Sequence, residues 1–149
     1  MALKKISSRF SMAVHILSLL ATGDGATLTS ERMAGSINTN PVVVRKIMGM
    51  LKKAGFLNVR AGTGGAYLLK NIEDISLLDV YRAVEVVEEH DLFNFHDNPN
   101  PDCPVGANIE SVFRSTLLQA QNAMEQVLAD VPLKQLVHDL NEKISSSES

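Results

Sequence analysis

The chain of 149 residues has the length of one domain with an appendage, and with 45% hydrophobic residues it can form a core. It contains neither a signal peptide nor an apolar run near the roughly 18 residues of a membrane span, so we expect a cytoplasmic protein that does not bind a membrane. A single cysteine excludes an internal disulfide framework and any site that takes several thiolates from one chain.

The net charge of −3 conceals a basic and an acidic half. Residues 1–70 carry ten basic and two acidic side chains, a balance of +8, whereas residues 71–149 carry four basic and fifteen acidic ones, a balance of −11. A nucleic-acid-binding protein is recognised by a local basic face and not by its overall charge. Such a face is therefore expected in the first half of this chain.

The first forty residues contain two helical patterns. Apolar residues recur at three- and four-residue spacing from Ser8 to Thr22, which predicts an amphipathic helix ended by the turn GDG at 23–25. The segment TLTSERMAGSI at 27–37 opens with threonines that suit a helix cap, and it is long enough for a short second helix.

A third helix is expected from Pro41 to about Ala54. Asn40 is a good N-cap, proline suits the first helical position, and Gly55 provides a stop. At about 100° per residue one face of this helix is apolar, with Val44, Ile47, Met48 and Leu51. The opposite face carries Val42, Arg45, Lys46, Gly49 and Lys53. A core helix with a solvated lysine-rich back would show the same pattern, so the neighbouring elements decide the interpretation.

Two short strand patterns, at 56–60 and 66–70, flank the glycine-rich sequence AGTGG and predict a hairpin. Helix, short helix, turn, basic helix and hairpin follow one another in a winged helix-turn-helix. The glycines do not complete the dinucleotide pattern G-x-G-x-x-G, because Tyr67 takes its last position, and there is no Walker lysine. They predict a hairpin tip that turns tightly and can lie along a DNA backbone.

The second half contains a short helix from about Ser76, a proline-rich loop, the longest helical pattern at about 107–130, and a last helix after Pro132. A helix of that length spans about 35 Å, which is more than a DNA-binding unit of about 70 residues can cover. We therefore expect part of its apolar stripe to contact a second copy of the chain. The expected dimer residues are Ile109, Val112, Phe113, Leu117, Ala120, Met124 and Val127.

Four segments resemble the Rrf2 (Rrf-two) family of bacterial winged-helix regulators, which includes the iron–sulfur cluster regulator and the cysteine-metabolism repressor. They are SSRFSMAVHIL, MA at 33–34, IMGMLKKAGFL, and GTGGAYLLKNIEDISLLDVYRAVE. The resemblance extends over about residues 3–145 and is strongest to a small branch with a single cysteine. It implies a homodimer that represses or activates promoters, with its third helix in the major groove and its wing tip on the minor groove or backbone.

The fold expected from these observations is mainly α with a small β-hairpin wing. It divides into a winged helix-turn-helix domain at 1–85, a connecting and sensor loop at 86–106, dimerisation helices at 107–145 and a disordered tail at 146–149. The DNA-binding residues that the resemblance and the helical wheel indicate are Ser8, Arg9, Asn40, Val42, Val43, Arg45, Lys46, Lys53, Arg60 and Thr63.

These residue types suit different parts of a duplex. Arg45 can contact guanine with two hydrogen bonds, and Val42 or Val43 can contact a thymine methyl group. The side chains expected at phosphates are Lys46, Lys53, Arg9 and Ser8.

The sequence departs from the family pattern at two places. Many members have R-G-x-x-G-G-aromatic at the wing, whereas Ala61 holds the arginine position here and Ala66 replaces the second paired glycine. Arg60 stands one place early, which on a strand turns its side chain to the other face unless a bulge intervenes. Cluster-binding members also offer three cysteines before the long helix, and Cys103 alone stands here, so no iron–sulfur cluster or other cofactor is expected.

Cys103 precedes the long helix, whose N-terminus lowers a thiol pKa, while the neighbouring Asp102 acts in the opposite direction. One interpretation is a redox switch through sulfenic acid, a mixed disulfide or a bridge between subunits, and the other is an inert cysteine beneath the dimer helix. The same loop offers a metal ion a mixed set of ligands, but their spacing matches no known metal-binding pattern. The set is His90, Asp91, His96, Asp97 and Asp102, together with Cys103. A small molecule is a further candidate for the effector, which the sequence does not identify.

The sequence thus predicts a DNA-binding transcriptional regulator, a homodimeric repressor at a palindromic operator. The alternative is a winged-helix interaction module that has lost specific DNA binding, which the displaced Arg60 favours and the basic half opposes. An enzyme is not expected, because Cys103 with His96 or His90 lacks a third orienting group and an oxyanion motif.

Overall fold

The computed structural model describes residues 8–23, 27–62, 65–85 and 96–148. In these ranges the chain is mainly helical with one antiparallel hairpin, which confirms the expected fold class. None of the helices there combines the length and apolarity that a membrane span requires. The elements are α1 (Ser8–Thr22), α2 (Ser30–Ile37), α3 (Pro41–Lys53), β1 (Leu57–Val59), β2 (Ala66–Leu68), the 3-10 helix η1 (Ile72–Asp74), α4 (Leu77–Val84), α5 (Pro104–Ala129) and α6 (Leu133–Glu148).

Local hydrogen bonds fix the turn between α2 and α3. Thr29 caps α2 by accepting from the backbone N–H of Arg32, and Asn38 ends this helix with a left-handed φ of 64°. The side-chain oxygen of Asn40 then accepts from the N–H of Val42 at 2.8 Å, which confirms the expected N-cap of α3. The turn therefore holds the two helices in a defined orientation.

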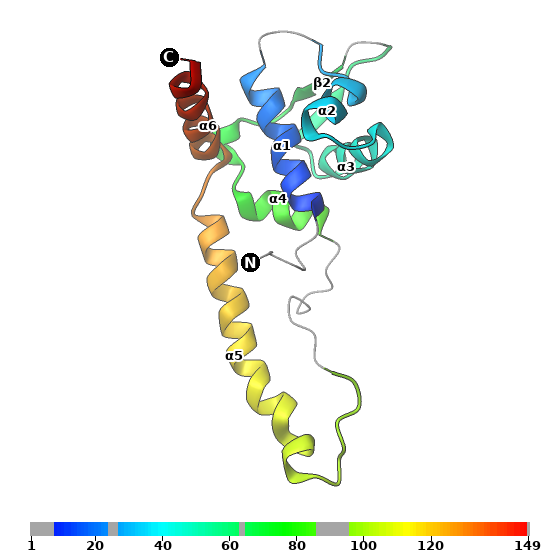
Figure 1. The fold of residues 1–149 in the computed structure, drawn as a ribbon, viewed down its shortest axis with the longest axis vertical. Coiled ribbons are helices and arrows are strands. Elements are labelled where there is room, and N and C mark those ends of the chain that lie inside the picture. Colours follow the sequence, from blue (N-terminus) through cyan, green and yellow to red (C-terminus); the bar gives the residue numbers. More distant parts are fainter. Residues whose placement is uncertain (1–7, 24–26, 63–64, 86–95, 149) are drawn as a thin grey trace.

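The core of the molecule lies between α1, α3, α4 and the hairpin (Figure 1). The apolar face expected for α3 is buried, and α1 contributes Ile16 and Leu17. Full burial of a leucine or isoleucine side chain stabilises the fold by about 1.5–3 kcal/mol. The basic face of α3 consequently lies on the outside of a helix that the core holds in place.

The wing is attached to the segment that enters α2. Its strands pair Leu57 with Leu68 and Val59 with Ala66, and the N–H of Ala66 donates to the carbonyl of Leu28 at 3.1 Å. Gly65 has a φ of +73°, and a Cβ placed on it would lie 2.8 Å from the Thr27 side chain. Gly65 therefore serves a close approach to Thr27 and to the backbone of Leu28, a role that the sequence does not predict.

The helix α5 extends away from the core as an arm, and only its C-terminal end adjoins α4 (Figure 1). At that end the N–H of Leu77 donates to the carbonyl of Val131, and the N–H of Leu133 donates to the carbonyl of Ile75. The helix α6 then folds back against α1 and η1. The connection between α5 and α6 is thus tied to the segment that enters α4 by backbone hydrogen bonds on both sides of Pro132.

Several element boundaries differ from the sequence expectation. The strands, expected at 56–60 and 66–70, are shorter, at Leu57–Val59 and Ala66–Leu68. The helix α5 begins at Pro104 and not near 107, because proline fits the first turn of a helix and Cys103 takes the N-cap position. The helix α6 continues to Glu148, so residues 146–148 are helical and not a tail. The hydroxyl groups of Ser146 and Ser147 donate to carbonyls one turn earlier, which satisfies these side chains within the helix.

Candidate nucleic-acid interface

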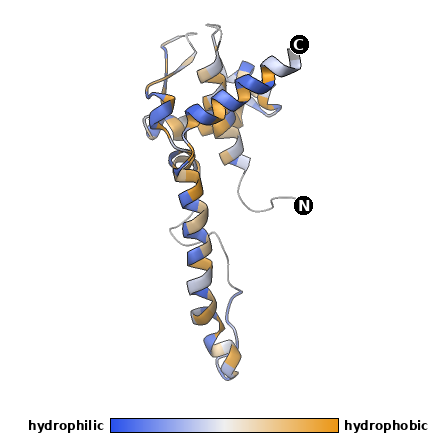
Figure 2. Cartoon of the chain, turned by 90° about the vertical axis from the view of Figure 1, so that its left-hand side faces the viewer, coloured by the Kyte–Doolittle hydropathy of each residue, from blue (hydrophilic) through white to orange (hydrophobic). Residues whose placement is uncertain are grey.

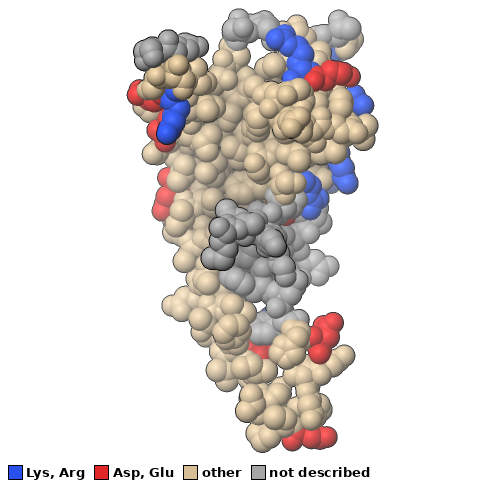
Figure 3. All heavy atoms as spheres, viewed as in Figure 1, with Lys and Arg blue, Asp and Glu red and all other residues tan. Residues whose placement is uncertain are grey.

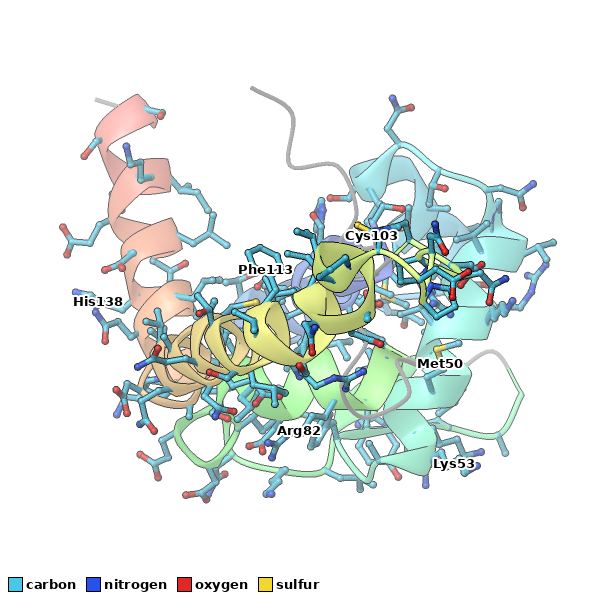
Figure 4. All side chains as sticks on the ribbon, turned by 90° about the horizontal axis from the view of Figure 1, so that it is seen from below. Met50, Lys53, Arg82, Cys103, Phe113 and His138 are labelled. Carbon is cyan, nitrogen blue, oxygen red and sulfur yellow. The ribbon has the colours of Figure 1, made fainter. Side chains whose placement is uncertain are left out.

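The outer face of α3 presents a mixed apolar and basic surface. Val42 is 62% exposed and Val43 36%, and Arg45, Lys46 and Lys53 are exposed as well. Lys53 projects outward from the end of the helix (Figure 4). Because Asn40 uses its side-chain oxygen for the helix cap, its amide nitrogen is the group left for DNA. The structure therefore brings the predicted residues of α3 to one accessible surface.

Arg45 has partners on α2 that the sequence interpretation did not include. Its Nη1 lies 3.3 Å from Oε1 of Glu31 and 3.2 Å from the hydroxyl of Ser30. The backbone N–H of Glu31 and the hydroxyl of Ser30, followed by Arg45, lower the pKa of the Glu31 carboxyl. Glu31 is thus a carboxylate at neutral pH, and it stands on the surface expected to contact DNA.

A groove of about 510 Å³ separates α3 from the wing. Leu28, Met48, Val59 and Ala66 give it an apolar lining, and Glu31, Arg45 and Lys52 contribute charged groups. Lys52 was missed by the sequence interpretation, although its position seven residues after Arg45 places both on one side of the helix. Lysine and arginine atoms gather over α2 and α3, whereas acidic atoms mark the far end of α5 (Figure 3).

Arg60 faces away from this groove. The guanidinium of Arg60 lies 4.8 Å from the ring centre of Tyr67. The backbone N–H of Arg60 donates to the carbonyl of Gly65. Side chains alternate along a strand, so Arg60 and Tyr67 share the face opposite Val59, which lines the groove. The expected shift of this arginine to the other face of the hairpin therefore matches the structure. Thr63, which the sequence places at the wing tip, lies outside the described residues.

Ser8 and Arg9 lie at the start of α1, next to the end of α4 (Figure 1). Burial raises the pKa of Glu85 on this side of the molecule, and the positive charge of Arg9 partly opposes that rise. Arg9 is thus close enough to Glu85, the residue that follows α4, for its positive charge to act on the Glu85 carboxylate. Ser8 and Arg9 do not line the groove between α3 and the wing.

Cys103 is the exposed N-cap residue of α5 (Figure 4). The backbone N–H groups of Gly106 and Val105 lower the pKa of its thiol. In the single chain the thiol is therefore accessible and not covered by α5. Among the described residues no group of three His, Cys, Asp or Glu side chains is placed to hold a metal ion, and His90 and Asp91 lie outside them.

The predicted dimer residues lie along the arm. Val112 is 70% exposed, Val127 63%, Phe113 48% and Ile109 37%, while Ala120 is exposed and Leu117 and Met124 are half-buried. Hydrophobic and hydrophilic colours alternate along α5, and the hydrophobic one recurs over most of its length (Figure 2). The helix is described over its whole length and contains no buried residue.

Comparison with known proteins relates this geometry to regulators. The family model described as Rrf2, iron-dependent transcriptional regulator, matches residues 6–139. The chain is 50% identical over 135 residues to YwnA of Bacillus subtilis, a candidate HTH-type transcriptional regulator, with coverage of 91% of this chain and 98% of the relative.

Solved structures share the fold. One crystal structure, described as that of a candidate DNA-binding protein, is 43% identical with a TM-score of 0.67, and the match covers 87% of this chain and 98% of that one. CymR of Staphylococcus aureus is 21% identical with a TM-score of 0.66, and the match covers 88% of this chain and 96% of that one. The winged-helix architecture of regulators is therefore the architecture of this chain.

Proposed function

Because the chain belongs to the Rrf2 family and is a DNA-binding transcriptional regulator, we propose that it acts as a homodimer that binds a palindromic operator and represses the promoter there. The single observation that carries the dimer is α5, whose 26 residues include no buried one. Contiguous exposed apolar surface in a globular protein marks an interaction site. A second α5 offers the same stripe, and a two-fold axis is the commonest way to pair identical surfaces.

A two-fold dimer also sets the geometry of DNA binding. Two copies of α3 that enter successive major grooves on one side of a duplex read half-sites about 34 Å apart. In each half-site Arg45 contacts guanine and Val42 contacts a thymine methyl group, while Lys46, Lys52 and Lys53 contact phosphates. Repression follows where the operator overlaps the site that the polymerase occupies.

The proposal includes no iron–sulfur cluster. Such clusters are held by several cysteine thiolates, and Cys103 is the one thiol that a chain supplies. The donor set therefore does not fit this cofactor, although the family description mentions iron. Instead, hydrogen peroxide can oxidise the exposed Cys103 thiolate to sulfenic acid: the O–O bond breaks, one oxygen is transferred to the sulfur, and the other leaves as water. The lowered pKa of Cys103 supports this reactivity, because the thiolate is the form that reacts.

Selection from a random duplex pool tests the proposal without knowledge of the operator. We expect wild-type protein to enrich a palindrome, to bind it with steep salt dependence in fluorescence anisotropy, and to prefer it over a scrambled duplex. The variant Arg45→Ala/Lys46→Ala should stay folded and dimeric but lose this preference. Failure to enrich any sequence would indicate the alternative, an interaction module without specific DNA binding.

The same assay tests the thiol. Mild peroxide should change the affinity of wild-type protein for the enriched duplex and leave Cys103→Ser unaffected. Equal responses of the two proteins would remove Cys103 from the mechanism and direct the search for the effector to metals and small molecules.

A further inference from the structure

Glu31 lies inside the basic surface, between α2 and the DNA-reading side of α3. Its Oε1 is 3.3 Å from Nη1 of Arg45, the same nitrogen is 3.2 Å from the hydroxyl of Ser30, and that hydroxyl lies 3.2 Å from Oε2 of Glu31. The three side chains thus form a closed ring of polar contacts. Both ends of the ion pair remain accessible, since the side chains of Arg45 and Glu31 are 55% and 68% exposed.

A carboxylate at this place works against general affinity for nucleic acid. Residues 1–70 contain ten basic side chains but only two acidic ones, and Glu31 is one of these. DNA presents a phosphate charge about every 1.7 Å along its axis, so a negative side chain on the contact surface repels any duplex regardless of sequence. Because this repulsion is the same for the operator and for unrelated DNA, it adds to specificity only where the correct duplex offers contacts that offset it.

The ion pair also restricts how Arg45 can bind. A free arginine can rotate to the nearest phosphate, which carries no sequence information. With Nη1 engaged by Glu31 and Ser30, the donors on Nη2 and Nε are left for an external acceptor. Guanine offers two acceptors, O6 and N7, to such a pair of donors in the major groove.

We propose that Glu31 is a specificity-determining residue, which holds Arg45 for base contact and opposes its use as a non-specific phosphate ligand. The inference rests on the proposed sequence-specific DNA binding. It predicts that removing the carboxylate raises affinity for unrelated DNA while the preference for the operator falls.

The test compares Glu31→Gln with Glu110→Gln in the full-length protein. Glu110 forms a similar exposed pair with Arg114 at 3.0 Å on α5, so both changes remove one negative charge and one ion pair, but only Glu31 adjoins α3. The probes are the duplex that wild-type protein enriches from a random pool and a scrambled duplex of the same composition, measured by anisotropy.

We expect Glu31→Gln to bind the scrambled duplex about two- to five-fold more tightly and to lower the ratio of the two affinities by a similar factor. Glu110→Gln should leave the ratio at the wild-type value. An unchanged or increased ratio in Glu31→Gln would overturn the proposal. Failure of wild-type protein to enrich any duplex would instead remove the proposed function, and this inference with it.

Two further variants separate charge from geometry. Glu31→Asp keeps the charge but shortens the side chain by one methylene, so it should release Arg45 and lower the ratio of the two affinities although the negative charge is retained. In an Arg45→Ala background, Glu31→Gln should no longer change the ratio of the two affinities, because Glu31 acts on this ratio through Arg45. A wild-type ratio in Glu31→Asp, or an undiminished effect without Arg45, would contradict the holding role.

Discussion

The helices α3 and α5 both carry an apolar stripe, but the chain treats the two stripes differently. In α3 the side chains of Val44, Ile47 and Leu51 are almost fully buried, while the residues opposite them stay exposed. In α5 none of the 26 residues is buried, and Val112 is 70% exposed. Other elements of the same chain cover the apolar stripe of α3, whereas too few elements surround α5 to cover its stripe.

This difference separates two sources of stability. The free energy of unfolding that α3 contributes belongs to the monomer, so it does not depend on protein concentration. The apolar area of α5 contributes fully only when something covers it, and a second copy does so in a concentration-dependent way. Substitutions in the two helices should therefore differ in kind as well as in size.

The largest effect is expected from Val112→Asp on α5. If two α5 helices pair, the symmetry brings two carboxylates into an apolar contact, and dimerisation should weaken by about 4 kcal/mol, a factor near a thousand in Kd. Sedimentation velocity over a concentration series measures this change. Asn122→Asp adds the same charge to an exposed position of the same helix and should leave the dimer intact. A monomeric wild-type protein, or a dimer that tolerates Val112→Asp, would contradict pairing through this stripe.

Leu51→Ala on α3 should lower the free energy of unfolding by about 3 kcal/mol, because a fully buried leucine leaves a cavity. Urea denaturation measures it, and the loss should be the same at every protein concentration. Val112→Ala provides the comparison, since its cost should shrink as the protein is diluted. A concentration-dependent loss for Leu51→Ala would mean that the α3 core forms only in the dimer.

Predictions from the sequence were most accurate for features that depend on the residues of a single element. The bounds of α1 and the Asn40 cap follow from local periodicity and capping chemistry, and both are confirmed. Two local features were predicted wrongly. The proline-rich surroundings of Pro104 concealed the first turn of α5, and the end of α6 was expected to be a tail.

Contacts between distant segments were harder to predict. No local pattern shows that Gly65 must approach Leu28, because the pairing of the wing with the entry to α2 is a property of the folded chain. The pair of Glu31 and Arg45 is of the same kind, since fourteen residues and a tight turn separate its members. The candidate site could therefore be predicted as a helix face, but its acidic member and the groove beside it required the structure.

The caps of the two helices give the smallest expected effects and sharpen the comparison. Asn40 accepts from the N–H of Val42 at the start of α3, whereas no side-chain hydrogen bond caps the described first turn of α5, where Cys103 holds the cap position. Asn40→Ala should lower the free energy of unfolding by about 1 kcal/mol, and Cys103→Ser should leave it unchanged or raise it slightly, because a serine hydroxyl is the better cap.

Urea denaturation of both variants under reducing conditions measures these differences. If Cys103→Ser were instead destabilising by as much as Asn40→Ala, the thiol would contribute to packing that the exposed position does not suggest. The serine variant would then be unsuitable as the control for oxidation, and a Cys103→Ala protein would be needed to separate loss of the thiol from loss of stability.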